Sequence, residues 1–342
     1  MKAAYLNKLN SSLKFSYSLK YKKLYQGQVL TKNYFTGICK SQIFEIYNGR
    51  ENKKYIPHLL GHEATGIVVD KHKSVKKVKL GDRVILTWIK CKGKQSNNPI
   101  FFHGKKKINS GSVTTFSDHS IVSENRLLKL PKNISLRKGV ILGCAFPTGS
   151  GMILNNVKKP LNKTIAFVGL GGVGVSALLT SLNFKFKSMY AFDISSKRIN
   201  FLKKNIKSKK KIYFLKSNKK LYAKYINKFD YVIETSGSIS GIESAFKILK
   251  NSGTMVLASH PQKGKKIKID PFEFIKGKKI IGSWGGVKNY DNESKSIFKI
   301  LNKIKNFEKI FNSDIYSFEN INKAVKDLKN NKVLRPIIKL TN

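Results

Sequence analysis

Between residues 164 and 282, short apolar runs alternate with stretches in which apolar residues recur at helical spacing. Short runs bounded by turn residues predict buried strands, and the spaced stretches predict helices. The predicted strands are residues 164–170, 189–194, 211–215, 231–234, 254–258 and 279–282. The predicted helices are residues 173–182, 197–204 and 242–249, the last followed by an Asn-Ser-Gly segment typical of a helix end. This alternation predicts a doubly wound α/β domain, in which helices cover both faces of a parallel sheet.

The first 145 residues follow a different pattern. Their apolar runs are short and are separated by turn residues such as Gly81-Asp82, which predicts a β-rich domain. From about residue 292 the chain has amphipathic helical character over 297–304 and 321–328, and it ends in the strand-like run 336–340. A length of 342 residues fits two domains, since one domain takes about 150 residues.

Charge is the most unusual feature of the composition. The chain has 67 Lys+Arg against 19 Asp+Glu, a formal net charge of +48, and only six of the basic residues are arginine. A nucleic-acid surface would concentrate its charge on one patch and use arginine for bidentate contacts, whereas lysine is spread evenly along this chain. The composition therefore favours drift in an AT-rich genome, with a polyanion-binding surface as the alternative.

Composition also excludes several classes of protein. Hydrophobic residues make up 41% of the chain, which is too many for a disordered protein. Three cysteines cannot form a disulfide framework, so we expect a reducing compartment, the cytoplasm. No signal-peptide core follows Met1, and the uncharged stretch 164–184 is broken by glycines, so no membrane partner is predicted.

A glycine-rich turn lies between the first predicted strand of the α/β domain and its helix. Its backbone is expected to approach a pyrophosphate that lies at the helix N-terminus. Asp193 follows at the end of the next predicted strand, where an acidic side chain hydrogen-bonds ribose hydroxyls. Its charge would repel a 2′-phosphate, so the pattern favours NAD over NADP. The residues of the turn are Gly169, Gly171, Gly172, Val173 and Gly174.

A second set of residues combines soft and borderline metal ligands. Cys39, His62 and Cys144 come from three separate segments, and the carboxylate Glu63 follows the histidine. Two thiolates and one neutral imidazole balance the charge of Zn²⁺ and leave a fourth position open, as a catalytic zinc requires. The spacing by itself is unspecific, because isolated cysteines are more often buried as small apolar side chains. From these residues alone, a zinc site and an ordinary core position both stay open.

The sequence around these residues favours the zinc site. The segments are Thr-Gly-Ile-Cys-Lys-Ser-Gln at 36–42, Pro-His-Leu-Leu-Gly-His-Glu-Ala-Thr-Gly-Ile-Val at 57–68, Gly-Asp-Arg-Val at 81–84, Leu-Gly-Cys-Ala-Phe-Pro-Thr-Gly at 142–149 and Lys-Val-Leu-Arg-Pro-Ile-Ile-Lys at 332–339. Together with the glycine turn they resemble, in the same order and over nearly the whole chain, the zinc-dependent alcohol dehydrogenases of the medium-chain dehydrogenase/reductase superfamily.

The resemblance implies roles for the residues of the metal set. Cys39, His62 and Cys144 would be the ligands of one catalytic zinc, and Glu63 would be the adjacent or alternating carboxylate. Ser41 would pass the proton of the alcohol towards solvent.

The resemblance also implies cofactor and substrate contacts. Asp193 would hold the adenosine ribose with Arg198 beside it, and Arg335 would contact the pyrophosphate. Trp88 would form a wall of the substrate pocket, and His260 would approach the nicotinamide. Ordinary surface charges remain the alternative for the two arginines, and a core position remains the alternative for the tryptophan.

By the same resemblance, residues 1–145 and 286–342 would form a GroES-like β-rich catalytic domain, interrupted by a Rossmann NAD-binding domain of residues 146–285. Zinc and nicotinamide would lie in the cleft between them. The implied reaction is the reversible oxidation of a small-molecule alcohol to an aldehyde or ketone, with hydride transfer to NAD, in a homodimer or homotetramer. Within the family, residues 111–126 and the segment Gly143-Cys-Ala resemble a less characterised branch, for which we expect a polar, sugar- or polyol-like substrate. The cationic surroundings would also suit an acidic or phosphorylated substrate.

Some positions depart from the family pattern. Lys40 stands where a histidine is frequent, and Phe44 replaces the histidine of the proton relay. Gln42 replaces the aspartate that orients the zinc histidine, so that contact is expected to be weakened or supplied elsewhere. Many members also hold a structural zinc with four cysteines, but residues 90–112 contain only Cys91. The sequence therefore predicts one catalytic zinc and no structural zinc.

Two other functions remain as alternatives. A zinc-free member of the quinone-reductase type would share the fold, but it would have no reason to keep Cys39, His62, Glu63 and Cys144 in their motifs. A non-catalytic NAD-binding protein with a polyanion-binding surface predicts one basic face and binding that weakens steeply with salt.

Overall fold

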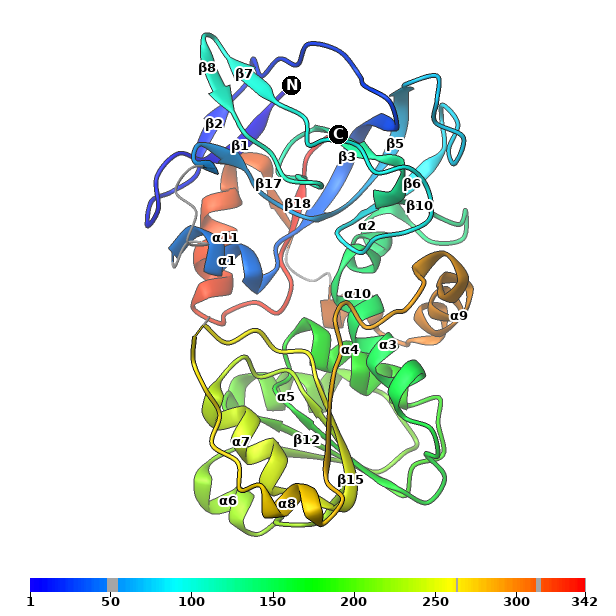
Figure 1. Cartoon of the computed structure of the whole chain (residues 1–342), viewed down its shortest axis with the longest axis vertical. Coiled ribbons are helices and arrows are strands. Elements are labelled where there is room, and N and C mark those ends of the chain that lie inside the picture. The colour runs from blue at the N-terminus through cyan, green and yellow to red at the C-terminus, as the bar shows by residue number, and fades with distance from the viewer. Residues whose placement is uncertain (48–54, 263, 312–314, 342) are drawn as a thin grey trace. The chain divides into compact units, whose positions relative to one another are not determined.

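The computed structural model describes residues 1–47, 55–262, 264–311 and 315–341 (Figure 1). Contacts divide the chain into two compact units, each of which is described by itself. The first unit contains Met1–Cys144, Asn289–Asp291 and Phe311–Asn342, and the second contains Ala145–Lys288 and Asn292–Ile310. Within the described ranges, no helix has both the length and the apolar character needed to cross a bilayer.

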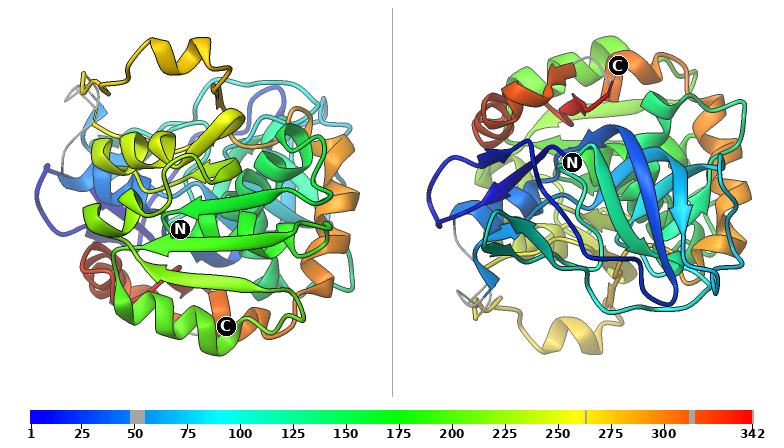
Figure 2. Two further views of the ribbon diagram at one scale, coloured as in Figure 1. Left: turned by 90° about the horizontal axis from the view of Figure 1, so that it is seen from below. Right: turned by 90° about the horizontal axis from the view of Figure 1, so that it is seen from above.

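The second unit is built around a six-stranded sheet in the order β13-β12-β11-β14-β15-β16. Every pair in this sheet is parallel, and helices lie on both of its sides (Figure 2, left). This arrangement confirms the doubly wound α/β fold expected from the alternating pattern. The strands are β11 (Thr164–Val168), β12 (Ser188–Asp193), β13 (Ile212–Lys216), β14 (Phe229–Glu234), β15 (Leu249–Leu257) and β16 (Lys279–Gly282).

The helices of the second unit differ from the prediction in two places. Helix α7 ends at Lys247, and the Asn-Ser-Gly segment lies inside β15, where Ser252 has a φ of 59°. Pairing of β15 with β14 across a register shift overrides the local helix-end signal. The described helices are α3 (Ala145–Asn156), α4 (Gly172–Ser181), α5 (Ser196–Asn205), α6 (Lys219–Ala223), α7 (Ile239–Lys247), α8 (Phe272–Ile275), α9 (Tyr290–Lys303) and α10 (Phe307–Phe311).

The second difference concerns α9, which was expected to belong with the β-rich domain. Residues Asn292–Ile310 pack with the second unit instead. Ile300 of α9 and Ile304, which follows the helix, line a cavity of about 190 Å³ together with Leu179, Leu182 and Ile206 of the same unit.

The first unit is rich in β-structure and is organised by the long strand β3 (Gln28–Gly37). β3 pairs antiparallel with β5 (Glu63–Lys71), β9 (His119–Ser123) and β18 (Ile337–Lys339). The same sheet contains β6 (Arg83–Thr87), β10 (Leu127–Lys129) and β17 (Ile315–Ser317). Two smaller sheets are formed by β1 (Ala3–Leu6), β2 (Lys14–Ser16) and β4 (His58–Leu59), and by β7 (Phe101–His103) and β8 (Lys106–Ile108). The helices are α1 (Lys40–Tyr47), α2 (Leu136–Gly139) and α11 (Ile321–Lys329), with short 3₁₀ turns η2 (Glu124–Arg126), η3 (Val140–Gly143) and η4 (Phe318–Asn320).

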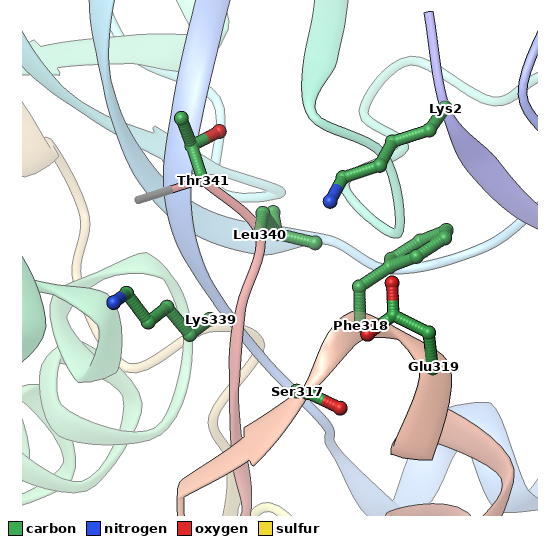
Figure 3. Close-up of a pocket in the computed structure, with 7 residues that line it drawn as sticks. All are labelled: Lys2, Ser317, Phe318, Glu319, Lys339, Leu340 and Thr341. Carbon is green, nitrogen blue, oxygen red and sulfur yellow. The ribbon is translucent and has the colours of Figure 1, made fainter.

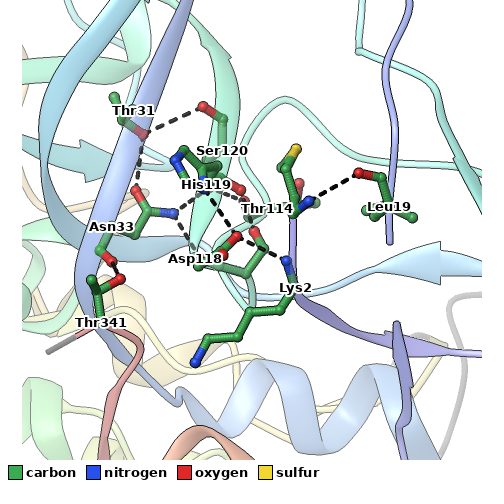
Figure 4. Close-up of polar contacts among 11 residues, drawn as sticks. Lys2, Leu19, Thr31, Asn33, Thr114, Asp118, His119, Ser120 and Thr341 are labelled. Atoms are coloured by element: carbon green, nitrogen blue, oxygen red, sulfur yellow. Dashed lines mark hydrogen bonds and ion pairs between the residues drawn. The ribbon is translucent and has the colours of Figure 1, made fainter. Parts of the chain in front are cut away.

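Buried polar contacts tie the C-terminal segment to β3 (Figure 4). The Thr341 hydroxyl donates to the carbonyl of Asn33 at 2.9 Å, and the Asn33 amide donates to the Ser120 hydroxyl at 2.7 Å. Helix α11 adds an apolar face to the same core cluster as Ile38 and Ile46, through Ile321, Ala324, Val325 and Leu328. The last strand is therefore held beside β3 by both its backbone and its neighbours.

Asp230 fixes the start of β14 against β11, and its contacts predict a pH-dependent contribution to stability. Burial alone would raise the pKa of this carboxyl, but the N–H and hydroxyl of Thr164, each 2.9 Å from Oδ2, and the ammonium groups of Lys250 and Lys163 lower it. We expect Asp230→Asn to reduce the free energy of unfolding by about 1 kcal/mol at neutral pH. Because the folded-state pKa is depressed, this difference should shrink as the pH falls below about 3.9, the ordinary value for aspartate.

Urea unfolding across this pH range measures the effect, with the exposed Asp70→Asn as control. A constant difference between wild type and the Asp230 variant at all pH values would contradict the assignment.

Candidate active site

Strand pairing brings four predicted residues to one edge of the large sheet of the first unit. β3 runs antiparallel to β5 and β18, and β5 runs antiparallel to β6. Cys39 follows the end of β3, while His62 precedes β5 and Arg335 precedes β18. Trp88 follows the end of β6. In a pair of antiparallel strands, the end of one strand lies beside the beginning of the other. These four residues therefore lie close together in the fold.

The three predicted metal ligands converge. One ligand atom from each of Cys39, His62 and Cys144 lies within 4.8 Å of the other two, and His62 Nε2 is 3.3 Å from Cys144 Sγ. Cys144 reaches the cluster because it directly follows the 3₁₀ turn η3. In the described part of the chain this is the one group of three or more such side chains with metal-binding spacing.

The two thiols are not equivalent. A hydrogen bond between them lowers the pKa of Cys39 well below its ordinary value, and the charges of Arg335 and His62 lower it further against the effect of burial. The same hydrogen bond, together with burial, raises the pKa of Cys144 well above its ordinary value. The pKa of Cys39 is therefore lower than that of Cys144.

The donor set fits zinc. Zinc–sulfur bonds of about 2.3 Å and zinc–nitrogen bonds of about 2.0–2.1 Å place tetrahedral ligand atoms roughly 3.5–4 Å apart. The spread of at most 4.8 Å seen here needs only small side-chain rotations to reach that geometry. Two thiols and an imidazole are also the soft and borderline ligands that zinc prefers over calcium or magnesium.

Gln42 contacts the ring nitrogen of His62 that points away from the thiols. Its Nε2 lies 3.0 Å from His62 Nδ1 and 3.1 Å from Glu45 Oε2. Gln42 is buried on α1, one helical turn before Glu45. The orienting contact that we expected to be weakened or moved is thus made by Gln42 itself, with a carboxylate behind it. Gln42 and Glu45 are three residues apart, a spacing that places two side chains next to each other on a helix, so this contact could have been predicted from the sequence.

Glu63 is fully buried and forms an ion pair with Arg335. Arg335 Nη2 lies 2.6 Å from Glu63 Oε2, and Arg335 as a whole residue is 5% exposed. Burial would lower the pKa of Arg335, but the Glu63 carboxylate raises it well above its ordinary value. Gly37 and Gly143 leave the room for this carboxylate, because a Cβ on either would lie 2.5–2.6 Å from Glu63 atoms. These two glycines were not predicted as part of the site.

The observed role of Arg335 is therefore the ion pair with Glu63, in addition to the contact with a pyrophosphate that the resemblance predicts. Its Nε is buried and has no hydrogen-bond partner among the described residues. The contact with a pyrophosphate stays a prediction.

The remaining predicted residues of the first unit lie around the cluster. Ser41 follows Cys39 by two positions on α1, and its Oγ is 3.5 Å from Gln42 Oε1. The Trp88 ring is edge-on to the His62 ring at a centroid distance of 6.5 Å.

The glycine turn of the second unit has the expected strand–turn–helix context. Gly169 directly follows β11 with a φ of 87°, a conformation that residues with a side chain rarely adopt. Gly171 caps α4, whose first turn contains Gly172, Val173 and Gly174. The first turn of a helix offers backbone N–H groups and the positive end of the helix dipole, which suit a phosphate.

Asp193, at the end of β12, holds this turn through a hydrogen bond. Its Oδ2 accepts from Leu170 N at 2.8 Å and its Oδ1 accepts from Ser195 N at 2.8 Å. Arg198 Nη1 lies 3.5 Å from Oδ2. A carboxylate has about four lone-pair sites, so Asp193 retains acceptor capacity for a ribose hydroxyl. His260, which the resemblance places near the nicotinamide, has its ring 5.1 Å from that of Trp284.

A separate cavity of about 250 Å³ lies in the first unit, near the C-terminal strand (Figure 3). Two lysines and one glutamate give it a mixed charge, and Lys2 Nζ lies over the Phe318 ring at 5.0 Å. None of the predicted site residues lines it. The lining residues are Lys2, Ser317, Phe318, Glu319, Lys339, Leu340 and Thr341.

The Glu63–Arg335 pair generates a prediction about stability. Arg335→Met should lower the free energy of unfolding by about 3–5 kcal/mol, because it leaves a buried carboxylate without its counter-charge. Glu63→Gln combined with Arg335→Met should recover most of that loss. Denaturant unfolding of the single and double variants measures both effects. A single variant as stable as wild type would contradict the pairing.

Two family models match the chain. The model described as "Alcohol dehydrogenase GroES-like domain" matches residues 25–132, and the model described as "Zinc-binding dehydrogenase" matches residues 172–303. Among curated relatives, the class-3 alcohol dehydrogenase of Drosophila melanogaster is 25% identical, covering 89% of this chain and 88% of that protein. An alcohol dehydrogenase of Malus domestica is 26% identical, covering 92% of this chain and 90% of its own length.

Solved structures share the fold over the full length. Benzyl alcohol dehydrogenase from Acinetobacter calcoaceticus superposes with a TM-score of 0.85 at 23% identity, covering 99% of each chain. An alcohol dehydrogenase zinc-binding domain protein from Burkholderia ambifaria gives a TM-score of 0.86 at 20% identity, covering 100% of this chain and 99% of its own. With both family models matched in order and the metal-ligand triad assembled, the chain belongs to the zinc-dependent alcohol dehydrogenases of the medium-chain dehydrogenase/reductase superfamily.

Proposed function

We propose that this protein is a zinc-dependent, NAD-linked dehydrogenase that interconverts a small-molecule alcohol and the corresponding aldehyde or ketone. The observation that carries the proposal is the convergence of Cys39, His62 and Cys144, whose ligand atoms lie within 4.8 Å of one another. The two curated relatives described above are both named alcohol dehydrogenases, which supports the same reaction class.

The residues present would hold the metal through two sulfurs and His62 Nε2. Zinc bound there would supply Lewis acidity at the substrate oxygen, and NAD would accept the hydride. Gln42, against Nδ1 of His62, keeps the imidazole turned so that Nε2 faces the thiols. Arg335 balances the charge of Glu63 beside the cluster.

Ser41 is the proposed proton carrier. Its hydroxyl lies on α1 between a metal ligand and Gln42, and it accepts the substrate proton at Oγ as it passes its own proton on. Phe44 cannot continue such a relay, so we propose that the next acceptor is a ribose hydroxyl or water. Asp193 and Arg198 are proposed to hold the adenosine ribose, and the first turn of α4 the pyrophosphate.

We propose one zinc per chain. Cys91, the third cysteine, is buried outside the cluster, and burial raises the pKa of its thiol to about 12, which disfavours the thiolate that zinc requires.

Metal analysis of the purified protein tests the proposal directly. We expect about one zinc per chain in the wild type and in the Cys91→Ser control, and none in Cys144→Ser, because two ligands alone hold zinc poorly. The wild type and control should then reduce NAD with at least one alcohol of a panel that spans unbranched, polyol, sugar and phosphorylated alcohols, whereas Cys144→Ser should not.

Each of three other outcomes would contradict part of this proposal. Wild-type protein that binds NADH but holds no zinc would favour the zinc-free reductase. Two zinc ions per chain would overturn the single-zinc proposal. Binding of a polyanion that weakens steeply with salt, without turnover of any alcohol, would favour the non-catalytic alternative.

We also propose that the protein is a homo-oligomer. β16 is an edge strand of the six-stranded sheet, and large apolar side chains around it are exposed. An edge strand with apolar neighbours is a favourable surface for pairing with a second copy. The exposed side chains are Phe272, Phe274, Ile275, Ile281 and Trp284.

Light scattering measures this directly. Wild-type protein should have a multiple of the chain mass, and Ile281→Asp, which places a charge on β16, should shift it towards the monomer. The control Leu161→Asp changes an exposed apolar residue elsewhere in the same unit and should have no effect. A monomeric wild type would contradict the proposal.

A further inference from the structure

Glu234 is a buried carboxylate of the second unit that the proposed chemistry does not use. It is the last residue of β14, in the middle of the parallel sheet, and it is 0% exposed. No lysine or arginine forms an ion pair with it within the described ranges, although the chain has 67 such residues. A buried carboxylate without a counter-charge is costly unless hydrogen bonds replace one.

Hydroxyl and backbone groups of two loops take the place of the missing cation. Glu234 Oε1 accepts from Ser236 N at 2.8 Å and also from the Ser236 hydroxyl. Its Oε2 accepts from the hydroxyl of Ser259, just beyond β15. The carboxylate therefore joins the loop that follows β14 to the loop that follows β15.

Thr235, which lies between Glu234 and Ser236 in the sequence, hydrogen-bonds to the glycine turn and to the strand before it. Thr235 N donates to the carbonyl of Val168 at 2.9 Å, and Thr235 Oγ1 donates to the carbonyl of Gly169 at 2.7 Å. A Cβ on Gly169 would lie 2.6 Å from Ser236 Cα, so the two turns are in close backbone contact. The loops that follow β11, β14 and β15 are thus one connected structure.

These loops lie at the carboxyl ends of the strands, where parallel sheets of this kind bind their ligands. We infer that Glu234 is a positioning residue for the cofactor, because it holds the Thr235–Ser236 turn that supports the pyrophosphate-binding backbone at Gly169. It acts through that turn and does not itself contact the cofactor. The inference rests on the proposed binding of NAD and adds a residue that neither the glycine pattern nor the metal set contains.

Fluorescence titration with NADH on the purified full-length protein tests the inference. Glu234→Ala removes all three acceptor contacts and should weaken NADH binding by about tenfold or more, since small displacements of a binding backbone are costly. Glu234→Gln keeps an acceptor for Ser236 and a polar partner for Ser259, so it should restore affinity to within about threefold of wild type. Glu243→Ala is the matched control, because that carboxylate of the same unit accepts one backbone N–H, from Lys268 at 2.8 Å.

A second variant keeps the test valid if Glu234→Ala does not fold. Thr235→Val retains the shape of the side chain and removes the hydroxyl that donates to Gly169. It should weaken NADH binding by several-fold, with the thermal midpoint and zinc content close to wild type. A purely structural role would lower the thermal midpoint and leave the affinity of the folded protein unchanged.

The outcomes separate this inference from the proposed function. Wild-type protein that binds no NADH would overturn the proposed function and this inference with it. Wild-type protein that binds NADH, with Glu234→Ala and Thr235→Val binding equally well, would overturn the positioning role alone.

Discussion

The antiparallel pairing of β3 with β5 and β18 is the constraint on which the metal cluster depends. Cys39 lies just beyond the end of β3, His62 just before β5 and Arg335 just before β18. A slip of one residue in either register would turn these side chains to the opposite face of the sheet. The contacts of Asn33 with Ser120 and with Thr341 hold β3 against β9 and against the segment that follows β18, and so oppose such a slip. Hydrogen bonds outside the cluster therefore help to hold its residues in register.

Charge at the site is balanced locally, and the lysine-rich surface does not contribute to that balance. The Cys39 thiol and the Glu63 carboxyl group lie near one buried cation, Arg335, in surroundings that strengthen electrostatic interactions. Arginine suits this position better than lysine, because it remains charged when buried and offers several donors in fixed directions. Glu234 in the second unit is satisfied by hydroxyl and backbone groups instead. Among the described residues, Glu63 and Glu234 are the carboxylates that are 0% exposed, and neither forms an ion pair with lysine, the most abundant cation of the chain.

Local patterns in the sequence were sufficient for the α/β fold and the glycine turn, because apolar runs, helical spacing and glycines act over a few residues. The contact of Glu63 with Arg335 could not be read in this way, since 272 residues separate the two and the pairing of β3 with both β5 and β18 brings them together. The metal triad was unspecific from its spacing and required the resemblance to a known family. The Asn-Ser-Gly segment shows that a local signal can also mislead. Its composition is typical of a helix end, but pairing with β14 makes it part of strand β15.

The proposed zinc ligands and the glycine turn belong to different units of the chain. All three ligands lie within Met1–Cys144, whereas the glycine turn, Asp193 and Arg198 lie within Ala145–Lys288. Loss of the metal therefore removes no residue from the proposed cofactor site, and a zinc-free form keeps every group that would bind NAD. For this reason NAD binding by itself cannot distinguish a zinc-dependent dehydrogenase from a zinc-free reductase of the same fold. Only the metal content, taken together with turnover of an alcohol, separates the two.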